Sequence, residues 1–188
     1  MRLFVAIELD DGARIAIADE QRRLKRLVGE GALKWVRPEH MHLTLAFLGE
    51  VDEDRSRALV DAMRKSIAHA PVAIAFGGIG LFPPHGPPRV LWLGVSAGEA
   101  EVIDIQRVVA ERVRGVGVEL EARPFHPHLT LARWRSSRQS DRRRLDGVDT
   151  REAVARITAS AVALVHSRLS STGPAYTALC EAPLVQPL

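Results

Sequence analysis

Two copies of one short pattern carry the chemistry that this sequence offers. Histidine is followed two positions later by threonine at His42 and Thr44, and again at His128 and Thr130, each time within the string HLTL. In a β-strand, residues two apart project from the same face, so each copy presents an imidazole and a hydroxyl to one bound group. The imidazole of histidine has an ordinary pKa of about 6.5, so it can act as an acid or as a base near neutral pH, while hydroxyls donate hydrogen bonds to oxyanions. The pair of motifs therefore favours phosphoryl transfer at a single phosphate.

The repetition matters more than either copy. One His-x-Thr strand is typical of the solvent face of an antiparallel sheet. Here both copies have the same flanking leucines, and in both halves of the chain a strand-like segment and a helix-like segment precede the motif. We therefore predict an internal duplication in which the leucine faces pack under helices and the two histidine faces meet in one cleft.

Composition indicates an ordinary folded protein. The 188 residues are 46% hydrophobic and 26% charged, which suits one compact domain or two small lobes that share a cleft. Cys180 is the single cysteine, so neither an intramolecular disulfide nor a cysteine-based zinc site is available. The N-terminal segment lacks the cleavage region of a secretory signal, and no apolar run reaches the roughly 18 residues of a membrane span. We expect a cytoplasmic protein without membrane contact, and nothing in the sequence requires more than a monomer.

Periodicity predicts an α+β chain with three principal helices and about eight strands. The first helix should begin at Asp10 or Asp11 and end at Gly29 or Gly31, and the other two should span residues 53–69 and 98–114. The expected strands are residues 2–9, 33–36, 42–49, 72–81, 89–95, 128–134, 154–166 and 175–182. The proline- and glycine-dense residues 82–88 should form a loop between two of these strands.

Positive charge is concentrated in one segment. Lysine and arginine exceed the acidic residues by 26 to 23, and six arginines against a single aspartate occur in residues 133–144. Such a cluster can neutralise phosphates, although charge runs are more often a solvated surface.

Several strings together resemble one known family. They are RLFVAIEL, WVRPEHMHLTLAFLGE, PPRVLWLGV, FHPHLTLARW and SRLSSTGPAYTAL, which extend over nearly the whole chain. They resemble the 2H phosphoesterase superfamily, and within it the RNA 2′,3′-cyclic phosphodiesterases formerly called 2′-5′ RNA ligases. The resemblance implies an α+β, bilobed fold of residues 1–188. Two antiparallel β-sheets would be duplicated about a pseudo-twofold axis, with helices on their outer faces and a central cleft. Each lobe would carry one His-x-Thr motif.

The resemblance also implies roles for individual residues. His128 would be the proton acceptor that activates water, and His42 the proton donor to the leaving 3′ oxygen, so that a 2′-phosphate remains. Arg133 would join Thr44 and Thr130 in binding the substrate phosphate. Strict alternation places Arg133 on the leucine face. It must then lie past the end of the strand or at a bulge to take this role, and the alternative is that it is simply a surface residue.

The implied substrate is RNA that ends in a 2′,3′-cyclic phosphate, such as a tRNA fragment, or a small cyclic nucleotide, with reversible 2′-5′ ligation as a further activity. No metal and no cofactor are implied. Phe47 and Trp134 are candidates for stacking on a base, against the alternative that both are core residues.

Two other functions fit parts of the sequence. A metal-dependent phosphohydrolase could use the His-x-His pairs that begin at His40 and His126, but this leaves both threonines without a role. It also finds no carboxylate to complete a catalytic site, since the nearest acids are Glu39 and, further off, Glu50 and Glu121. An RNA-binding module without catalysis explains the arginine cluster and the pI of about 9.6, but not the repeated HLTL.

Overall fold

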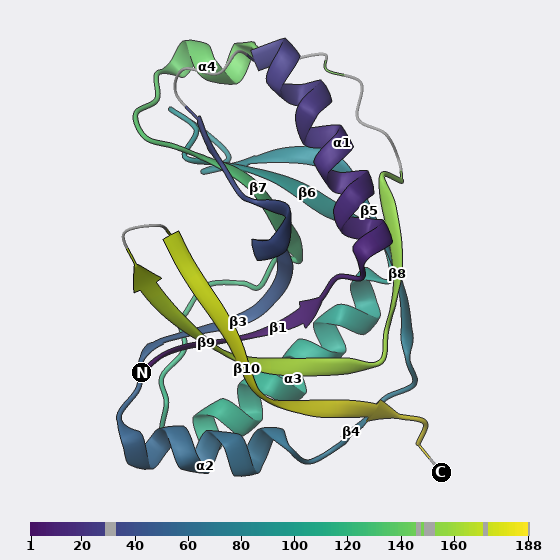
Figure 1. Ribbon diagram of the computed structural model, residues 1–188, viewed down its shortest axis with the longest axis vertical. Helices are drawn as coiled ribbons and strands as arrows, with labels where there is room; N and C mark the ends of the chain where they lie inside the picture. The colour runs from purple at the N-terminus through teal and green to yellow at the C-terminus, as the bar shows by residue number, and fades with distance from the viewer. Residues whose placement is uncertain (29–32, 146–147, 149–152, 171–172, 188) are drawn as a thin grey trace.

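The structure is a computed structural model that describes residues 1–28, 33–145, 148, 153–170 and 173–187. Within these residues the chain forms two five-stranded sheets (Figure 1). The first sheet has the order β3-β1-β9-β10-β4, formed by His42–Glu50, Arg2–Glu8, Ala161–Ser170, Gly173–Val185 and Ile67–Ala68. The second has the order β2-β7-β6-β5-β8, formed by Leu33–Trp35, His128–Trp134, Val90–Ala97, Val72–Phe82 and Ala155–Ala159.

The two sheets repeat one arrangement. Four neighbours in the first sheet, β3-β1-β9-β10, correspond in order to β7-β6-β5-β8 in the second, and each set begins with a motif strand. All strand pairs are antiparallel except β4 with β10. The predicted α+β fold with duplicated antiparallel sheets is therefore confirmed.

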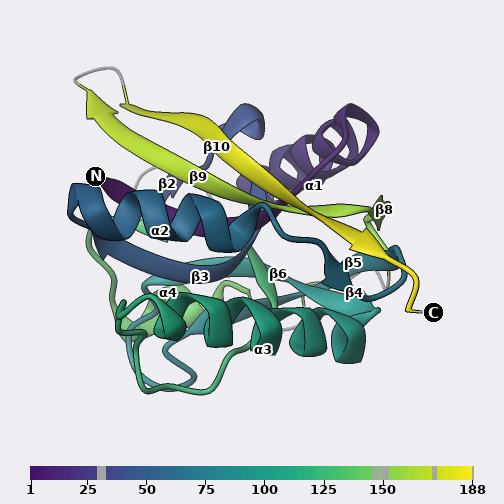
Figure 2. The same cartoon turned by 90° about the horizontal axis from the view of Figure 1, so that it is seen from below.

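The described residues also form four helices and a 3₁₀ turn (Figures 1 and 2). They are α1 (Asp11–Val28), η1 (Pro38–His40), α2 (Glu53–Met63), α3 (Glu99–Gly115) and α4 (Gln139–Arg143). α1 contacts β8 and η1, α2 contacts β9 and β10, and α3 contacts β3, β5 and α2. α1 begins as predicted, since the Asp10 carboxylate accepts a hydrogen bond of 2.7 Å from the Ala13 amide. It ends at Val28, and the predicted end at Gly29 or Gly31 lies outside the described residues.

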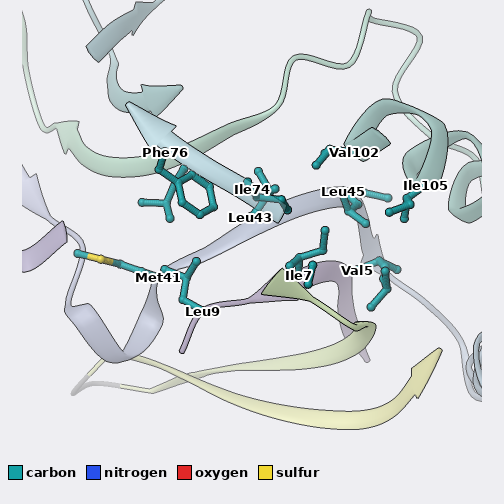
Figure 3. Close-up of a cluster of buried hydrophobic side chains, with 14 of the residues drawn as sticks. Val5, Ile7, Leu9, Met41, Leu43, Leu45, Ile74, Phe76, Val102 and Ile105 are labelled. Atoms are coloured by element: carbon teal, nitrogen blue, oxygen red, sulfur yellow. The ribbon is translucent and has the colours of Figure 1, made fainter. Parts of the chain in front are cut away.

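The core is built from the leucine faces of the motif strands and the helices beside them. Leu43 and Leu45 of β3, and Leu129 and Leu131 of β7, are each at most 2% exposed and belong to one hydrophobic cluster. Figure 3 shows Leu43 and Leu45 between β1, β5 and α3. Burying such a side chain contributes about 1.5–3 kcal/mol, so the alternation that buries leucine also fixes which face histidine must occupy.

The expected helix over residues 53–69 is too long. α2 ends at Met63, and Ile67–Ala68 form β4, which pairs with Leu184–Val185 of β10. The Arg112 guanidinium holds this turn, because it donates hydrogen bonds to the carbonyls of Ala62, Lys65 and Ser66. Ile67 is buried, with 1% of its surface exposed. Because it also falls at the helical spacing of the apolar residues before it, the sequence pattern extended the helix to include it.

The expected strand over residues 154–166 is two strands. β8 ends at Ala159 and pairs with β5 of the second sheet, whereas β9 begins at Ala161 and pairs with β1 of the first. The chain therefore crosses from one sheet to the other at Ser160. Because both strands are rich in buried apolar residues, the sequence pattern alone contains no sign of the crossing.

Candidate active site

The two motif strands lie beside each other. β3 pairs with β1, which sets Thr44 opposite Ala6, and β7 pairs with β6, which sets Thr130 opposite Trp92. β3 and β7, which belong to different sheets, are themselves in contact. The histidines and threonines are half-buried while the leucines between them are fully buried, so each motif has the predicted His-Thr face.

Both catalytic candidates are held by the backbone two residues earlier. Nδ1 of His128 lies 2.7 Å from the carbonyl oxygen of His126, and His42 makes a hydrogen bond to the backbone of His40. A carbonyl only accepts, so Nδ1 of His128 carries the proton and donates it. In the neutral ring Nε2 then has a free lone pair, which is the state that a general base requires.

His42 is enclosed by aromatic side chains. Phe4 stacks on its ring with centroids 4.6 Å apart, and Tyr176 meets it edge-on at 5.4 Å. Burial lowers the pKa of His42 to about 4. The backbone hydrogen bond to His40 opposes this as the next largest effect, and the nearby Arg14 and His40 side chains lower the pKa further. The free protein therefore holds His42 neutral at pH 7.

His128 has its own aromatic neighbours. Phe82 meets the ring edge-on at 5.0 Å, and the centroid of Trp92 lies at 6.1 Å. Trp92 lies across Gly80, where a Cβ would overlap the indole ring, so only glycine leaves room for it. Burial lowers the pKa of His128, and the positive charges of His126 and Arg133 add to this effect.

A β-bulge in each motif strand alters the alternation beyond the threonine. In β7, Trp92 pairs with Thr130 and Leu91 with Ala132, so Leu131 has no partner in β6. Leu131 and Ala132 are both buried, and Arg133 is exposed on the Thr130 side. The bulge that the binding role of Arg133 requires is therefore present, and the charge of Arg133 acts on both His128 and Tyr176.

The equivalent bulge in β3 places an aromatic residue at the corresponding position. Ala6 pairs with Thr44 and Val5 with Ala46, so Leu45 has no partner in β1 and Phe47 returns to the His42 side. Phe47 is 54% exposed, and its ring centroid lies 6.3 Å from that of Phe4. The interpretation of Phe47 as a core residue is therefore wrong.

Trp134 behaves differently. It follows Arg133 in β7, is partly buried, and packs against the core cluster. The core interpretation holds for Trp134, and Phe47 is the better placed of the two stacking candidates.

A sequence model described as LigT like Phosphoesterase matches this chain twice, over residues 7–92 and 93–176. The chain belongs to the LigT-like phosphoesterase family. Each of the two matches contains one His-x-Thr motif, as expected of a duplicated chain.

Named relatives and solved structures support this membership. The chain is 38% identical to an RNA 2′,3′-cyclic phosphodiesterase of Archaeoglobus fulgidus over 133 residues, 71% of this chain and 72% of the relative. It is 34% identical to the Methanothermobacter thermautotrophicus protein of the same name over 179 residues, 94% and 95% of the two chains. A crystal structure from Thermus thermophilus covers 99% of both chains with 28% identity and a TM-score of 0.79. Escherichia coli LigT in complex with 3′-AMP covers 98% of both with 26% identity and a TM-score of 0.75.

Two residues of this LigT-like site did not emerge from the sequence. Tyr176 of β10 contacts His42, Phe4 and His40 at centroid distances of 5.1–5.4 Å. Its only signals were that it is the single tyrosine and that it lies in one of the family-like strings. Its position depends on the order of the sheet, which no local pattern reveals.

Arg14 is the second such residue. From α1 its guanidinium donates to the carbonyls of Leu9, Pro38, Glu39 and Met41, at 3.1–3.4 Å. It thereby fixes the η1 turn that leads directly into His42. No sequence pattern indicates that an arginine near the start of a helix will bind the backbone of a distant turn.

Two further properties concern metals and membranes. Among the described residues, no three side chains of histidine, cysteine, aspartate or glutamate gather where they could hold a metal ion. In the same part of the chain, no helix has the length and apolar character needed to cross a bilayer. Whether activity depends on a metal is decided by turnover in the presence of a chelator.

Proposed function

We propose that this LigT-like phosphoesterase opens the 2′,3′-cyclic phosphate at an RNA end and leaves a 2′-phosphomonoester. The observation that carries the proposal is the pair of His-Thr faces on two contacting strands, with each imidazole hydrogen-bonded to the backbone two residues earlier. The relatives named RNA 2′,3′-cyclic phosphodiesterase support the reaction, and the 3′-AMP complex of E. coli LigT shows that a related protein binds a nucleoside monophosphate.

In the proposed reaction, water attacks phosphorus while Nε2 of His128 takes its proton. The bond between phosphorus and the 3′ oxygen breaks, and His42 gives a proton to that oxygen. The hydroxyl group from water stays on phosphorus, and exchange with solvent restores the protons of both rings. General acid–base help is worth about 10²–10⁴-fold.

Three side chains would hold the charge of the phosphate. Thr44 and Thr130 would donate to the non-bridging oxygens, since each lies on the face of its histidine. Arg133 would supply a positive charge from beyond the bulge.

The pKa of His42 sets a condition on this assignment. A group whose pKa is about 4 carries almost no proton at pH 7, yet the donor must be protonated. The phosphate brings a negative charge that opposes the positive charge of Arg14, and so raises the pKa of His42 in the complex. We therefore propose that His42 becomes a donor when substrate binds.

The decisive assay uses purified protein with EDTA and an oligonucleotide that ends in a 2′,3′-cyclic phosphate. We expect turnover to a 2′-phosphate, identified by ³¹P NMR, and loss of turnover in His42→Ala and His128→Ala. A 3′-phosphate product would reverse acid and base, and full activity of either variant would refute the two-histidine mechanism. Activity that EDTA abolishes and zinc restores would favour the metal-dependent phosphohydrolase. RNA binding without turnover would favour the non-catalytic module.

The proposal extends to the substrates, the cellular location and the oligomeric state of the protein. Self-cleavage of RNA by its own 2′-hydroxyl produces cyclic ends, so tRNA fragments and small cyclic nucleotides are both suitable substrates. In 2′-5′ ligation the 5′-hydroxyl of an RNA would attack phosphorus in place of water, and the same bond to the 3′ oxygen would break. The reverse of that step would cleave a 2′-5′ linkage and restore the cyclic phosphate. We propose a cytoplasmic monomer. Gel filtration and cell fractionation test these two properties.

A further inference from the structure

One buried polar side chain outside the His-Thr faces has no part in the mechanism above. Gln21 of α1 is 4% exposed, and its Nε2 donates hydrogen bonds of 2.9 Å to the carbonyl of Leu131 and 2.9 Å to that of Val36. Both partners only accept, so both amide hydrogens are used. An unpaired amide in this position would be costly to bury, so the two bonds hold Gln21 and its partners in one geometry.

The Leu131 carbonyl belongs to the bulge in β7. Leu131 is the residue without a partner in β6, and its carbonyl accepts a second hydrogen bond of 2.9 Å from the Val36 amide. The bulge is therefore held by α1 on one side and by the end of β2 on the other. Its position decides on which face the next exposed side chain, Arg133, emerges.

We infer that Gln21 is a positioning residue for Arg133, which it turns toward His128 and Thr130 by holding the bulge at Leu131. The part of Arg133 in catalysis rests on the proposed function, but the control of its direction does not. Without the amide, the Leu131 carbonyl keeps one of its two bonds and the Val36 carbonyl loses its side-chain donor. The bulge can then shift, and with it the side to which Arg133 points.

The test uses Gln21→Met, which preserves length and removes the donor. Its partner variant is Arg133→Gln, and its control is Glu20→Gln, the adjacent buried residue, whose carboxylate bonds Arg23 at 2.6 Å rather than β7. The first measurement is the NMR titration of His128 without substrate, which reads the Arg133 charge directly. The second is kcat/KM with a cyclic mononucleotide.

We expect Arg133→Gln and Gln21→Met both to raise the pKa of His128, because each takes a positive charge away from the ring. Gln21→Met should reduce kcat/KM by about 10- to 100-fold, as expected for a misplaced catalytic group. The double variant should be no worse than Arg133→Gln, and Glu20→Gln should behave as the parent protein.

A His128 pKa that Gln21→Met leaves unchanged, or losses that add in the double variant, would overturn the inference. If Gln21→Met does not fold, Gln21→Asn, whose shorter amide cannot reach both carbonyls, gives the same comparison. The NMR titration of His128 needs no turnover, so it tests the positioning role of Gln21 even if the proposed function is wrong.

Discussion

The proposed mechanism places His42 and His128 at one phosphate, and burial lowers the pKa of both rings, which has a consequence for activity as a function of pH. The productive form needs one ring protonated and one neutral, whichever ring has which role. Both pKa values lie below the ordinary 6.5, that of His42 at about 4. Above both values neither ring holds a proton, and below both values each ring does.

We therefore expect kcat/KM, which reports the free enzyme, to have its maximum on the acidic side and to fall about tenfold per pH unit above roughly pH 6.5. The kcat profile should lie at higher pH, because bound phosphate raises the pKa of His42. Initial rates with a cyclic mononucleotide across the pH range check both statements. A kcat/KM that continues to rise into alkaline pH would contradict them.

Phe47 offers a prediction on substrate binding. Its ring is exposed on the His42 face, and stacking on a base is worth about 1–3 kcal/mol. We expect Phe47→Ala to raise KM for an oligonucleotide about 5- to 150-fold at nearly constant kcat, with little change in Tm. Phe47→Trp should restore the low KM. An unaltered KM in the alanine variant would assign the base to another side chain.

The site residues that could be predicted from the sequence are those whose spacing within one strand determines the face from which the side chain projects. His42, Thr44, His128 and Thr130 share faces because they are two apart in strands, and the structure places them so. Tyr176 and Arg14 reach the same place through the order of strands and the packing of α1. Their positions beside His42 follow from the tertiary structure, so the spacing of residues in the sequence does not predict them.

At the scale of elements, the two bulges are the main departure from strict alternation. Alternation alone would have placed Arg133 with Leu129 and Leu131, and Phe47 with Leu43 and Leu45. One extra residue after each threonine reverses this, and the bulged residue in both strands is the second leucine of HLTL. Because a bulge is stabilised by partners such as Gln21, which is distant in sequence, the strand itself carries no mark of it.

The arginines of residues 133–144 differ in their surroundings: Arg142 makes hydrogen bonds within the protein, whereas Arg135, Arg138 and Arg143 are exposed. Arg142 of α4 donates to the carbonyls of Pro83, at 2.6 Å, and Gly86, at 3.2 Å. It thereby joins α4 to the loop that follows Phe82, the ring that contacts His128. The Arg142 guanidinium is therefore engaged in hydrogen bonds within the protein.

We expect Arg142→Gln to lower kcat/KM on a cyclic mononucleotide severalfold, because Phe82 loses its support beside His128. Limited proteolysis should become faster at the loop over residues 82–88. Arg143→Gln, the exposed neighbour, is the matched control. Equal effects of the two substitutions would show that charge, and not the bonds to the loop, is what matters.

At the scale of the whole molecule, the duplication could be predicted because it left identical strings in the sequence. The repeated strand order β3-β1-β9-β10 and β7-β6-β5-β8 follows from it. The crossing at Ser160 and the short parallel strand β4 could not, because each depends on which distant strand is available as a partner.

The distribution of charge over the molecule leads to a last prediction. In the described part of the chain, Arg135, Arg138 and Arg143 are exposed on α4 and the segment before it, which continues from Arg133. Arg142 anchors this helix beside the His128 half of the site. A strand of RNA whose cyclic end lies between the histidines can therefore place its upstream phosphates along these arginines.

We expect replacement of Arg135, Arg138 and Arg143 by glutamine to reduce kcat/KM more on an oligonucleotide than on a cyclic mononucleotide. The slope of log kcat/KM against log salt for the oligonucleotide should become shallower by about 0.7 for each phosphate that the variant no longer binds. Rates for both substrates at several salt concentrations measure this. If parent and variant share one slope, or if the two substrates are affected equally, the RNA strand leaves the site in another direction and the arginine segment is a solvated surface.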